Sequence, residues 1–380
     1  MKHVRTAIVG AGLSGLYAAW LLQQQGDQDY LLLEAREVPG GRIASPGTER
    51  VDLGPTWFWP DFQRELGRLI EELGLESFAQ FDSGDMVMER SPDEPPFRTA
   101  GYANSPPSMR LIGGMASLIE ALSSKLDPAK LCTGQVVRRL RARDTHVELD
   151  SEAADGSVTT WCAERVLLAL PPRLAQACIN FEPALPAALA AQWRATPTWM
   201  APHAKYVAVY DKPFWRERGL SGEGRSARGP LGEIHDASMP DGSAALFGFF
   251  GVPAQVRRQV AQDMLRMHCR AQLVRMFGVE AAAPRAEFIK DWADEPHTAT
   301  TADLDAVSHH TQAPPAGAAS GPWQGRLTGI ASEWSPQFPG YVAGAIEAAG
   351  LAVRALHRMQ PMPPELVPLR LEPGFCRRKA

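Results

Sequence analysis

The first 42 residues follow the order strand, glycine turn, helix, strand, acid, and this order limits the possible folds more than any other feature. Residues 6–9 form an apolar strand pattern, and residues 10–15 (GAGLSG) follow directly. A helical spacing of apolar residues comes next, and then a second apolar strand at residues 30–33. That strand ends on Glu34, 19 residues after the last glycine of the motif. The pattern is typical of a Rossmann-like unit that binds a dinucleotide.

Each part of this unit has a physical role toward a dinucleotide. The three glycines let backbone N–H groups and the helix N-terminus approach a pyrophosphate. The Glu34 carboxylate accepts hydrogen bonds from the ribose hydroxyls and repels a 2′-phosphate. A secretory signal is the alternative, because Lys2, His3 and Arg5 precede the apolar stretch. Glycines interrupt that stretch and no small-residue cleavage site follows, so we favour the dinucleotide site.

A second glycine loop directly after Glu34 indicates FAD rather than NAD. Residues 34–42 read EAREVPGGR, so two glycines precede Arg42 just beyond the ribose acid. This arginine adds a charge-assisted contact to a phosphate, which an NAD domain does not need. With GxGxxG, E-A-R and G-G-R, the chain resembles the flavin-containing amine oxidase family. The match continues at residues 51–57 (VDLGPTW), close to the D-x-G-x-x-W segment that this family has beside the flavin ring.

The resemblance extends from about residue 5 to about residue 358 and implies an α/β fold. This fold combines a Rossmann-like FAD-binding domain with an inserted α+β substrate domain of mixed sheet and helices. We expect a discontinuous FAD-binding domain at residues 1–60, 109–182 and 322–360. The substrate-binding domain then takes residues 61–108 and 183–321, and residues 361–380 form a solvated tail.

Periodicity predicts the main helices and strands. Helical spacing predicts helices at residues 61–75, capped by Asp61, and at residues 253–277 and 340–359. Alternation or short apolar runs predict strands at residues 136–149 (a pair), 166–170, 205–210, 244–251 and 326–330. Residues 91–107 and 311–322 are rich in proline with polar or small residues, and we expect loops there.

Residues 332–347 resemble the C-terminal flavin motif of the same family. In that motif an acid at the strand end, here Glu333, lies by the ribityl chain, and a helix N-terminus points at the pyrimidine side of the isoalloxazine. Two-electron reduction places negative charge there, which a helix dipole and the N–H of Val342 stabilise. Tyr341 matches the tyrosine that flanks the substrate at the flavin face. The alternative for Tyr341 is a core aromatic residue that only caps the helix.

Lys205 is the residue that the sequence most strongly favours as a catalytic residue. On a strand at residues 204–210 it shares a face with Val207 and Val209, so it either reaches solvent at a strand end or is held inside a site. A desolvated lysine has a depressed pKa and is able to position water or act as a base. The family has a lysine before Y-x-x-x-P-F-W that holds a water at flavin N5, and residues 210–215 (YDKPFW) match. We expect Lys205→Met to keep FAD but to slow flavin reduction or reoxidation.

The motifs and the resemblance together give three sets of candidate site residues. The catalytic set is Lys205 and Tyr341. The set expected to contact FAD is Gly10, Gly12, Leu13, Ser14, Gly15, Glu34, Ala35, Arg36, Gly41, Arg42, Gly54, Pro55, Thr56, Trp57, Val137, Trp292, Glu333, Tyr341 and Val342. The set expected to line a substrate cavity is aromatic and consists of Trp57, Trp59, Phe249 and Trp323.

The chain departs from the family pattern in the segment before the last strand. Many amine oxidases have a second tyrosine there that faces the first, and some have a cysteine bound to the flavin. Residues 292–303 contain neither tyrosine nor cysteine, so we expect noncovalent FAD and no two-tyrosine cage. Ser332 replaces a usual glycine and Ala343 a frequent glutamate, which leaves the substrate class open.

Composition excludes several other classes of protein. A net charge of −4 with a pI near 6.2 gives no reason to expect nucleic acid as a partner. A membrane span needs about 20 consecutive apolar residues, and the sequence has no such run. The five cysteines are scattered without CxxC spacing, so we expect no metal site, reduced thiols and a cytoplasmic protein.

Three functions remain open at this point. The first is an amine oxidase in which the α C–H of an amine passes a hydride to flavin N5 and dioxygen reoxidises the flavin, releasing H2O2. The second is a dehydrogenase or desaturase that passes electrons to another acceptor, and the third is a non-catalytic flavin-binding protein. Lys205 and Tyr341 favour an enzyme, because a scaffold does not need them. The sequence names neither the amine nor the oligomeric state.

Overall fold

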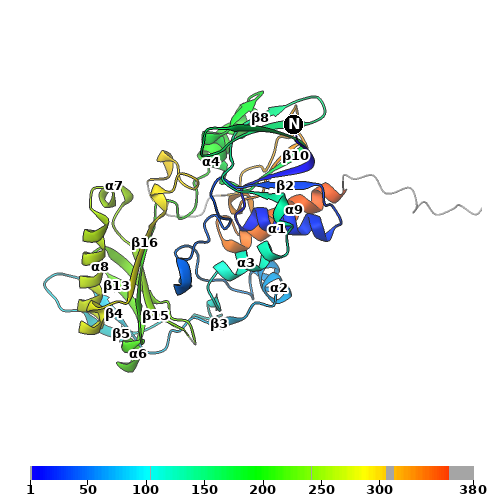
Figure 1. Ribbon diagram of the computed structural model, residues 1–380. Coiled ribbons are helices and arrows are strands. Elements are labelled where there is room, and N and C mark those ends of the chain that lie inside the picture. Colours follow the sequence, from blue (N-terminus) through cyan, green and yellow to red (C-terminus); the bar gives the residue numbers. More distant parts are fainter. Residues whose placement is uncertain (1, 103, 241, 305–311, 359–380) are drawn as a thin grey trace, which may run out of the picture.

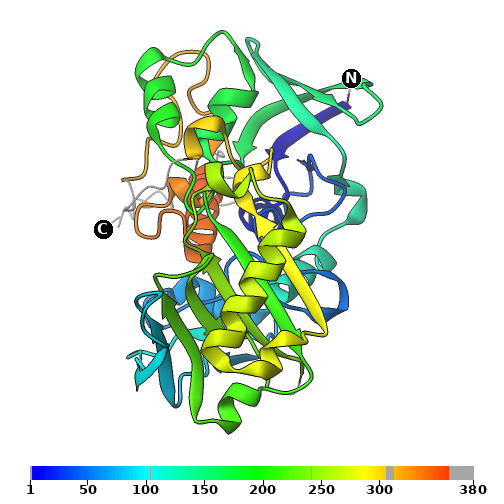
Figure 2. The same cartoon turned by 90° about the vertical axis from the view of Figure 1, so that its left-hand side faces the viewer.

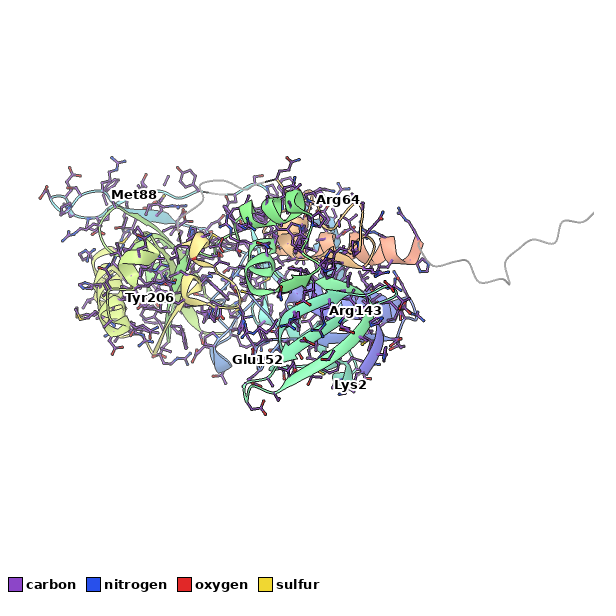
Figure 3. All side chains as sticks on the ribbon, turned by 90° about the horizontal axis from the view of Figure 1, so that it is seen from above. Lys2, Arg64, Met88, Arg143, Glu152 and Tyr206 are labelled. Atoms are coloured by element: carbon purple, nitrogen blue, oxygen red, sulfur yellow. The ribbon has the colours of Figure 1, made fainter. Side chains whose placement is uncertain are left out.

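The computed structural model describes residues 2–102, 104–240, 242–304 and 312–358. Two regions lie side by side, each organised around its own β-sheet (Figure 1). The mixed α/β architecture with a Rossmann-like nucleotide-binding unit is the one expected from the sequence. Seen from above, Tyr206 and Met88 lie in one region, and Arg143 and Glu152 lie in the other (Figure 3).

The first region contains a sheet with eight strands within the described ranges. Its order is β11-β8-β9-β10-β1-β2-β7, and β17 pairs with β10. The strands are β1 (Lys2–Val9), β2 (Tyr30–Leu33), β7 (Leu131–Cys132), β8 (Val136–Ala142), β9 (Val147–Glu152), β10 (Val158–Leu168), β11 (Asn180–Glu182) and β17 (Leu327–Gly329). Strand β1 runs parallel to both neighbours, with Val9 paired to Leu33 and to Leu168. The carboxyl ends of these strands therefore meet at one edge, where ligands bind in open α/β sheets.

Helices cover both faces of this sheet (Figure 1). Helices α1 (Leu13–Gln24), α2 (Arg64–Glu72), α3 (Ala116–Ser124) and α9 (Val342–Arg358) enclose one core, whereas α4 (Pro172–Cys178) and α5 (Ala187–Ala195) enclose the other. Successive residues of a strand point to opposite faces, so Ile8 belongs to the first core and Val9 to the second. The packing of α1 in the first core holds its start next to the end of β1.

The second region contains a sheet with seven strands in the part of the chain that is described. Its order is β16-β12-β15-β14-β13-β4-β5. The strands are β4 (Asp85–Glu89), β5 (Phe97–Ala100), β12 (Ala204–Tyr210), β13 (Leu220–Ser226), β14 (Leu231–Asp236), β15 (Ala244–Phe250) and β16 (Ala286–Asp291). Helix α8 (Gln262–Phe277) lies across one face and buries Leu273 and Phe277 (Figure 2). On the other face Val207 and Val209 pack with Val51 of the first region.

Short elements complete the described chain. Strands β3 (Ser77–Ala79) and β6 (Met109–Leu111) form a separate two-stranded sheet. Helices α6 (Phe214–Glu217) and α7 (Ala254–Arg257) flank the second sheet. The 3-10 helices are η1 (Gly47–Glu49), η2 (Pro128–Lys130), η3 (Val279–Ala282), η4 (Trp292–Asp294), η5 (Thr301–Asp303) and η6 (Ser332–Trp334).

Two helix expectations need correction. The single helix expected at residues 253–277 is two helices, α7 and α8, because Ala261 adopts an extended ψ of 141° between them. Arg257 at the end of α7 is buried and bonded to Asp291, which fixes α7 on β16 and separates it from α8. Asp61 does not cap a helix, because residues 60–63 form a turn and α2 begins at Arg64.

The domain division stays a prediction, although the packing refines where its boundaries belong. Helix α2 lies within the segment expected in the substrate domain, yet its Leu66 and Leu69 pack in the same core as α1 and α9. Leu189 and Trp193 of α5 likewise pack against the first sheet. The chain therefore crosses between the two regions after α2 and again after α5.

Candidate active site

A cavity of about 810 Å³ lies where the two regions meet. Its volume is in the range of cofactor and small-molecule sites, about 300–1,000 Å³. The β1–α1 turn, the end of β2 and residues 53–57 contribute from the first region, and β12 and β15 contribute Lys205 and Phe249. The start of α9 closes the wall with Tyr341, Val342 and Ala345. We call the part around the glycine turn and Glu34 the nucleotide end.

Backbone geometry shapes the nucleotide end. Gly10 has a φ of +102°, which an L side chain rarely adopts, and this turn brings the chain from β1 into α1. A Cβ on Gly15 would lie 1.9 Å from the Gly10 carbonyl oxygen, so only glycine fits where the helix passes the turn. No side chain caps α1 at Gly12, which leaves its first N–H groups available to an anion. The cradle fits a pyrophosphate.

Glu34 stands at the end of β2 in the cavity wall. It is 3% exposed, and it accepts hydrogen bonds from the Ala11 N–H at 2.7 Å and the Arg36 N–H at 2.9 Å. These bonds hold a carboxylate at the position that the fingerprint gives to the ribose acid. Arg36 in turn contacts Glu295 at 3.1 Å and Thr298 Oγ1 at 3.3 Å. The segment after β16 therefore covers the nucleotide end.

Arg42 links the second glycine loop to the C-terminal motif. Its Nη1 and Nη2 donate to the two carboxylate oxygens of Glu333 at 2.5 and 2.9 Å, and Nη2 also donates to Ser332 Oγ at 3.1 Å. Burial disfavours the charge of Arg42, but the adjacent Glu333 carboxylate outweighs it and raises the pKa of the guanidinium. Glu333 is 3% exposed and lies behind the cavity wall. Glu333 thus holds Arg42, which lines the cavity, and the expected place of Glu333 by the ribityl chain stays a prediction.

Lys205 is buried within the cavity wall despite its charge. It is 2% exposed, and its Nζ donates to Thr56 Oγ1 at 2.6 Å and to the Gly54 carbonyl oxygen at 3.1 Å. The ammonium also lies 4.0 Å from the centre of the Phe247 ring. Burial lowers the pKa of Lys205 to about 7. Of the two interpretations of its strand position, the structure therefore excludes a lysine that reaches solvent at a strand end.

Two further buried charges surround Lys205. Asp52 accepts a hydrogen bond from the Met115 N–H at 2.7 Å; burial raises the pKa of its carboxyl, and Lys205 opposes this. Arg110 on β6 donates to the carbonyl oxygens of Ala237 and Ser238, each at 2.9 Å, and burial lowers its pKa. Neither residue was a candidate from the sequence. Asp52 belongs to the D-x-G-x-x-W match, which was a usable signal, whereas nothing in the pattern around Arg110 indicates a site.

Aromatic side chains form another part of the cavity wall, which we call the aromatic end. Its residues are Trp57, Trp59, Trp199, Phe249 and Tyr341. The indole N–H of Trp57 donates to Gln80 Oε1 at 2.8 Å, and that of Trp59 donates to Ser108 Oγ at 3.1 Å. Tyr341 is 38% exposed at the start of α9, which excludes the alternative of a buried core aromatic.

Trp323 does not line the cavity, and this expectation is wrong. Its side chain is 1% exposed, and its indole N–H donates to the Pro183 carbonyl oxygen at 2.8 Å. The ring packs edge-on against Phe181, with 5.7 Å between the ring centres. Trp323 precedes β17 and fills the core beneath the first sheet, as most large aromatic residues do.

The structure brings most of the remaining candidates together. The cavity wall contains Gly10, Gly12, Leu13, Ser14, Glu34, Ala35, Arg36, Gly41, Arg42, Gly54, Pro55, Thr56, Trp57, Trp59, Val137, Lys205, Phe249, Trp292, Tyr341 and Val342. Gly15 lies behind the wall, where it permits the close approach of α1 to the turn. Their contacts with a cofactor stay predictions.

The sequence analysis missed the loop before β12, which contributes Trp199, Met200 and His203 to the wall. Met200 has a φ of +62°, an uncommon value for a residue with a side chain. Gly340 has a φ of +82°, and a Cβ there would lie 2.5 Å from Trp199 Cβ, so glycine lets this loop approach the start of α9. The loop carries no periodic pattern, and only Gly340 signals the contact.

Among the described residues, no group of three or more His, Cys, Asp or Glu side chains is placed to hold a metal ion. In the same ranges, no helix is long and apolar enough to cross a membrane.

Comparisons with known proteins agree with this geometry. The family model described as flavin containing amine oxidoreductase matches residues 101–357, and an NAD(P)-binding Rossmann-like domain matches residues 8–73. Probable flavin-containing monoamine oxidase A of Dictyostelium discoideum is 24% identical over 90% of this chain and 94% of its own length. Putrescine oxidase of Kocuria rosea is 25% identical over 77% of this chain and 82% of its own.

Solved structures show the same fold. A double mutant of putrescine oxidase superposes with a TM-score of 0.75 at 20% identity, covering 94% of this chain and 100% of that chain. Cyclohexylamine oxidase from Brevibacterium oxydans gives a TM-score of 0.75 at 20% identity, covering 93% of this chain and 99% of that chain. At these identities the likeness concerns architecture alone.

Proposed function

Because the chain belongs to the flavin containing amine oxidoreductase family, we propose that it oxidises the C–N bond of an amine and uses dioxygen as electron acceptor. Family membership makes FAD its cofactor and oxidoreduction its activity. When bound, FAD supplies the redox chemistry: it accepts a hydride equivalent from the amine α-carbon and returns the electrons to dioxygen as H2O2.

The residues at the nucleotide end are suited to hold this cofactor. The first N–H groups of α1 and the glycines at positions 12 and 41 leave room for a pyrophosphate, and Glu34 offers acceptors to the ribose. Arg42, held by Glu333, supplies a fixed positive charge nearby. Val342 begins α9 at the cavity wall, and its N–H favours negative charge on a reduced ring.

FAD is proposed to be held noncovalently. Residues 292–303 contain no cysteine, and Cys178 is the one cysteine among the described residues of the cavity wall. Burial raises the pKa of the Cys178 thiol, which disfavours the nucleophilic thiolate. Acid precipitation is therefore expected to leave the protein colourless and release all flavin into the supernatant.

The aromatic end is suited to an amine. Its low polarity favours loss of the ammonium proton, and only the neutral amine gives up a hydride readily. Trp57 is fixed by Gln80, and Tyr341 stands at the wall beside the start of α9, so two aromatic faces orient the substrate.

Lys205 carries the proposal. Its pKa of about 7 lets one buried group be cationic or neutral near physiological pH, between the aromatic residues and the nucleotide end. A cation there favours negative charge that develops when dioxygen takes up electrons. In its neutral form the Lys205 amine holds water by hydrogen bonding. Thr56 and Gly54 fix the nitrogen in place for either role.

One experiment tests the reaction and its acceptor together. The purified protein is mixed anaerobically with a panel of amines while its flavin absorbance is recorded, and air is then admitted with a peroxide assay. We expect at least one amine to bleach the flavin, and air to restore the colour with one H2O2 per flavin. Bleaching without recovery in air would instead support the dehydrogenase alternative, for which a relative named L-amino acid dehydrogenase in Synechocystis, 24% identical over 68% of this chain, is a precedent.

A further inference from the structure

The charges around the cavity determine which amines it is able to accept. Among the described residues that line it, the one carboxylate is Glu34, which lies at the nucleotide end and already accepts from Ala11 and Arg36. The aromatic end contains the rings of its five aromatic residues and the Lys205 ammonium. Within the described wall, therefore, no acid faces the place that a substrate side chain would occupy.

Two acids outside the wall, Glu233 and Asp52, are neighbours of residues that line it. Across the second sheet, Lys205 pairs in register with Phe249, and Phe249 pairs with Glu233 of β14. Glu233 Oε1 lies 2.6 Å from the Nε2 of His235, and its Oε2 forms an ion pair with Arg225. Asp52, next to Lys205, is buried and accepts from the backbone of Met115. The second oxygen of Asp52 has no hydrogen-bond partner among the described residues, but neither carboxylate belongs to the described cavity wall, so neither faces a second ammonium group of a substrate.

The arginines in and near the cavity wall are also bound to groups of the protein. Arg110 is buried and bonded to two carbonyl oxygens, and Arg225 is paired with Glu233. The arginines of the wall bind acids of the protein: Arg36 binds Glu295, Arg42 binds Glu333 and Arg138 binds Glu152. Lys205 already donates to two oxygens of the chain. At the described aromatic end Lys205 is therefore the cation that a substrate carboxylate would meet, and an ion pair there would occupy the ammonium N–H that the proposed reaction uses.

From this distribution we infer that the substrate is an apolar monoamine, whose only ionisable group is the reacting nitrogen. The inference rests on the proposed amine oxidation and narrows it: diamines and α-amino acids are rejected. Burial of an unpaired charge is costly, so a charged side group has to be neutralised before it enters. An alkyl ammonium has a pKa of about 10.4, so at pH 7.5 roughly one molecule in a thousand has that group neutral.

The test compares matched pairs of amines on the holoenzyme without oxygen. n-Pentylamine and 1,4-diaminobutane differ by one distal ammonium, and 2-phenylethylamine and phenylalanine differ by one carboxylate. Dissociation constants are taken from the perturbation of the flavin spectrum, and rate constants from its bleaching. We expect kred/Kd to be at least 100-fold lower for the charged member of each pair. The ratio of kred/Kd for n-pentylamine to kred/Kd for 1,4-diaminobutane should shrink about tenfold per pH unit from pH 7.5 to 9.5.

Glu233→Gln is the matched control, because Glu233 is the acid next to Phe249 across the sheet. In this variant the ratio of kred/Kd for n-pentylamine to kred/Kd for 1,4-diaminobutane should stay within threefold of the wild-type ratio. A fall in diamine binding of tenfold or more would mean that Glu233 recognises the second ammonium, and the inference would be overturned.

The outcomes separate this inference from the function on which it rests. If 1,4-diaminobutane or phenylalanine reduces the flavin as well as its uncharged partner, the substrate inference is wrong and amine oxidation stands. If no amine perturbs or reduces the flavin, both are wrong.

Discussion

The two ends of the cavity are built by different means. At the nucleotide end the main chain makes the site: Gly10 has a positive φ, and a Cβ on Gly15 would meet the Gly10 carbonyl oxygen at 1.9 Å. At the aromatic end side chains make it, and Lys205 depends on Gly54 and Thr56, 151 and 149 residues away in the sequence. The nucleotide end is thus shaped by local backbone geometry, whereas the surroundings of Lys205 depend on contacts between distant parts of the chain.

This difference predicts that the two functions separate under mutation. Changes in the glycine loops should remove FAD while leaving the fold of the second region intact. Changes around Lys205 should leave FAD bound and alter how fast it is reduced or reoxidised. A variant that affects both ends equally would contradict this separation.

Gly12→Ala is expected to have the largest effect. A Cβ at Gly12 would meet the protein no closer than 3.7 Å, so the chain accommodates it, but the methyl group occupies the approach of the pyrophosphate. FAD affinity should fall roughly a thousandfold, about 4 kcal/mol, while the melting temperature of the apoprotein stays unchanged. Flavin fluorescence titration measures the loss, and a fall of less than tenfold would contradict the assignment of this loop.

Gly15→Ala is the matched contrast. Its Cβ would collide with the Gly10 carbonyl oxygen, so the helix has to move away from the turn. We expect this variant to lose stability of the apoprotein itself, seen as a lower melting temperature without any flavin present.

Lys205→Met should reduce flavin reoxidation by about 100-fold at pH 6, because removal of one preorganised charge typically costs that much. FAD affinity should stay within threefold of wild type. Stopped-flow mixing of the reduced enzyme with oxygen measures the rate. Lys212→Met is the control, because this lysine is exposed just beyond the same strand and pairs only with Glu217 among the described residues; an equal effect of both variants would dismiss a special role for Lys205.

The sequence predicted the nucleotide end nearly completely and the aromatic end only in part. The spacing of glycines indicates where the backbone has to turn within a few residues, so the sequence predicted the part of the cavity wall from Gly10 to Arg42. The loop at Trp199 to His203 reaches the cavity wall, and Arg110 the surroundings of Lys205, through tertiary packing, which no local pattern encodes. The contact between Glu333 and Arg42 joins residues 291 apart in the sequence, and no local pattern predicted it.

Asp52→Asn tests how the buried charges act on one another. The Asp52 charge raises the pKa of Lys205 against the effect of burial, so its removal lowers that pKa further. Asparagine still accepts from the Met115 N–H, which preserves the local structure. The pH at which the reoxidation rate falls should move down by about one unit, a tenfold change in proton affinity. An unchanged midpoint in the pH profile would show that Asp52 does not act on Lys205.

Trp323→Phe should have the smallest effect on activity. The variant loses the hydrogen bond to the Pro183 carbonyl oxygen in the core, which should lower the free energy of unfolding by about 1–2 kcal/mol. The KM for the amine should not change, whereas Trp57→Phe, which breaks the contact with Gln80 at the aromatic end, should raise KM severalfold. Urea unfolding and steady-state kinetics on both variants would distinguish them; a raised KM in Trp323→Phe would contradict its place in the core.

Trp323 also illustrates a limit of composition. Trp59 and Trp323 are the same residue type in loops near strands, and the sequence gives no reason to prefer one of them for a cavity, whereas Trp57 is favoured by its place in the motif at residues 51–57. Packing separates them: Trp323 fills the space beside Phe181, and the other two reach the wall. Large aromatic residues serve cores and sites alike, so only the tertiary structure decides.

The pH dependence of flavin reoxidation in wild type and Lys205→Met tests the central claim most directly. With its pKa lowered by burial to about 7, Lys205 should be cationic below that pH, where the proposal has it favour electron uptake by dioxygen, and should lose this charge above it. The wild-type rate should therefore fall through a single step near pH 7, and Lys205→Met should give a low and flat profile. A flat wild-type profile, or the same step in the variant, would contradict the view that this one buried lysine controls the chemistry of the aromatic end.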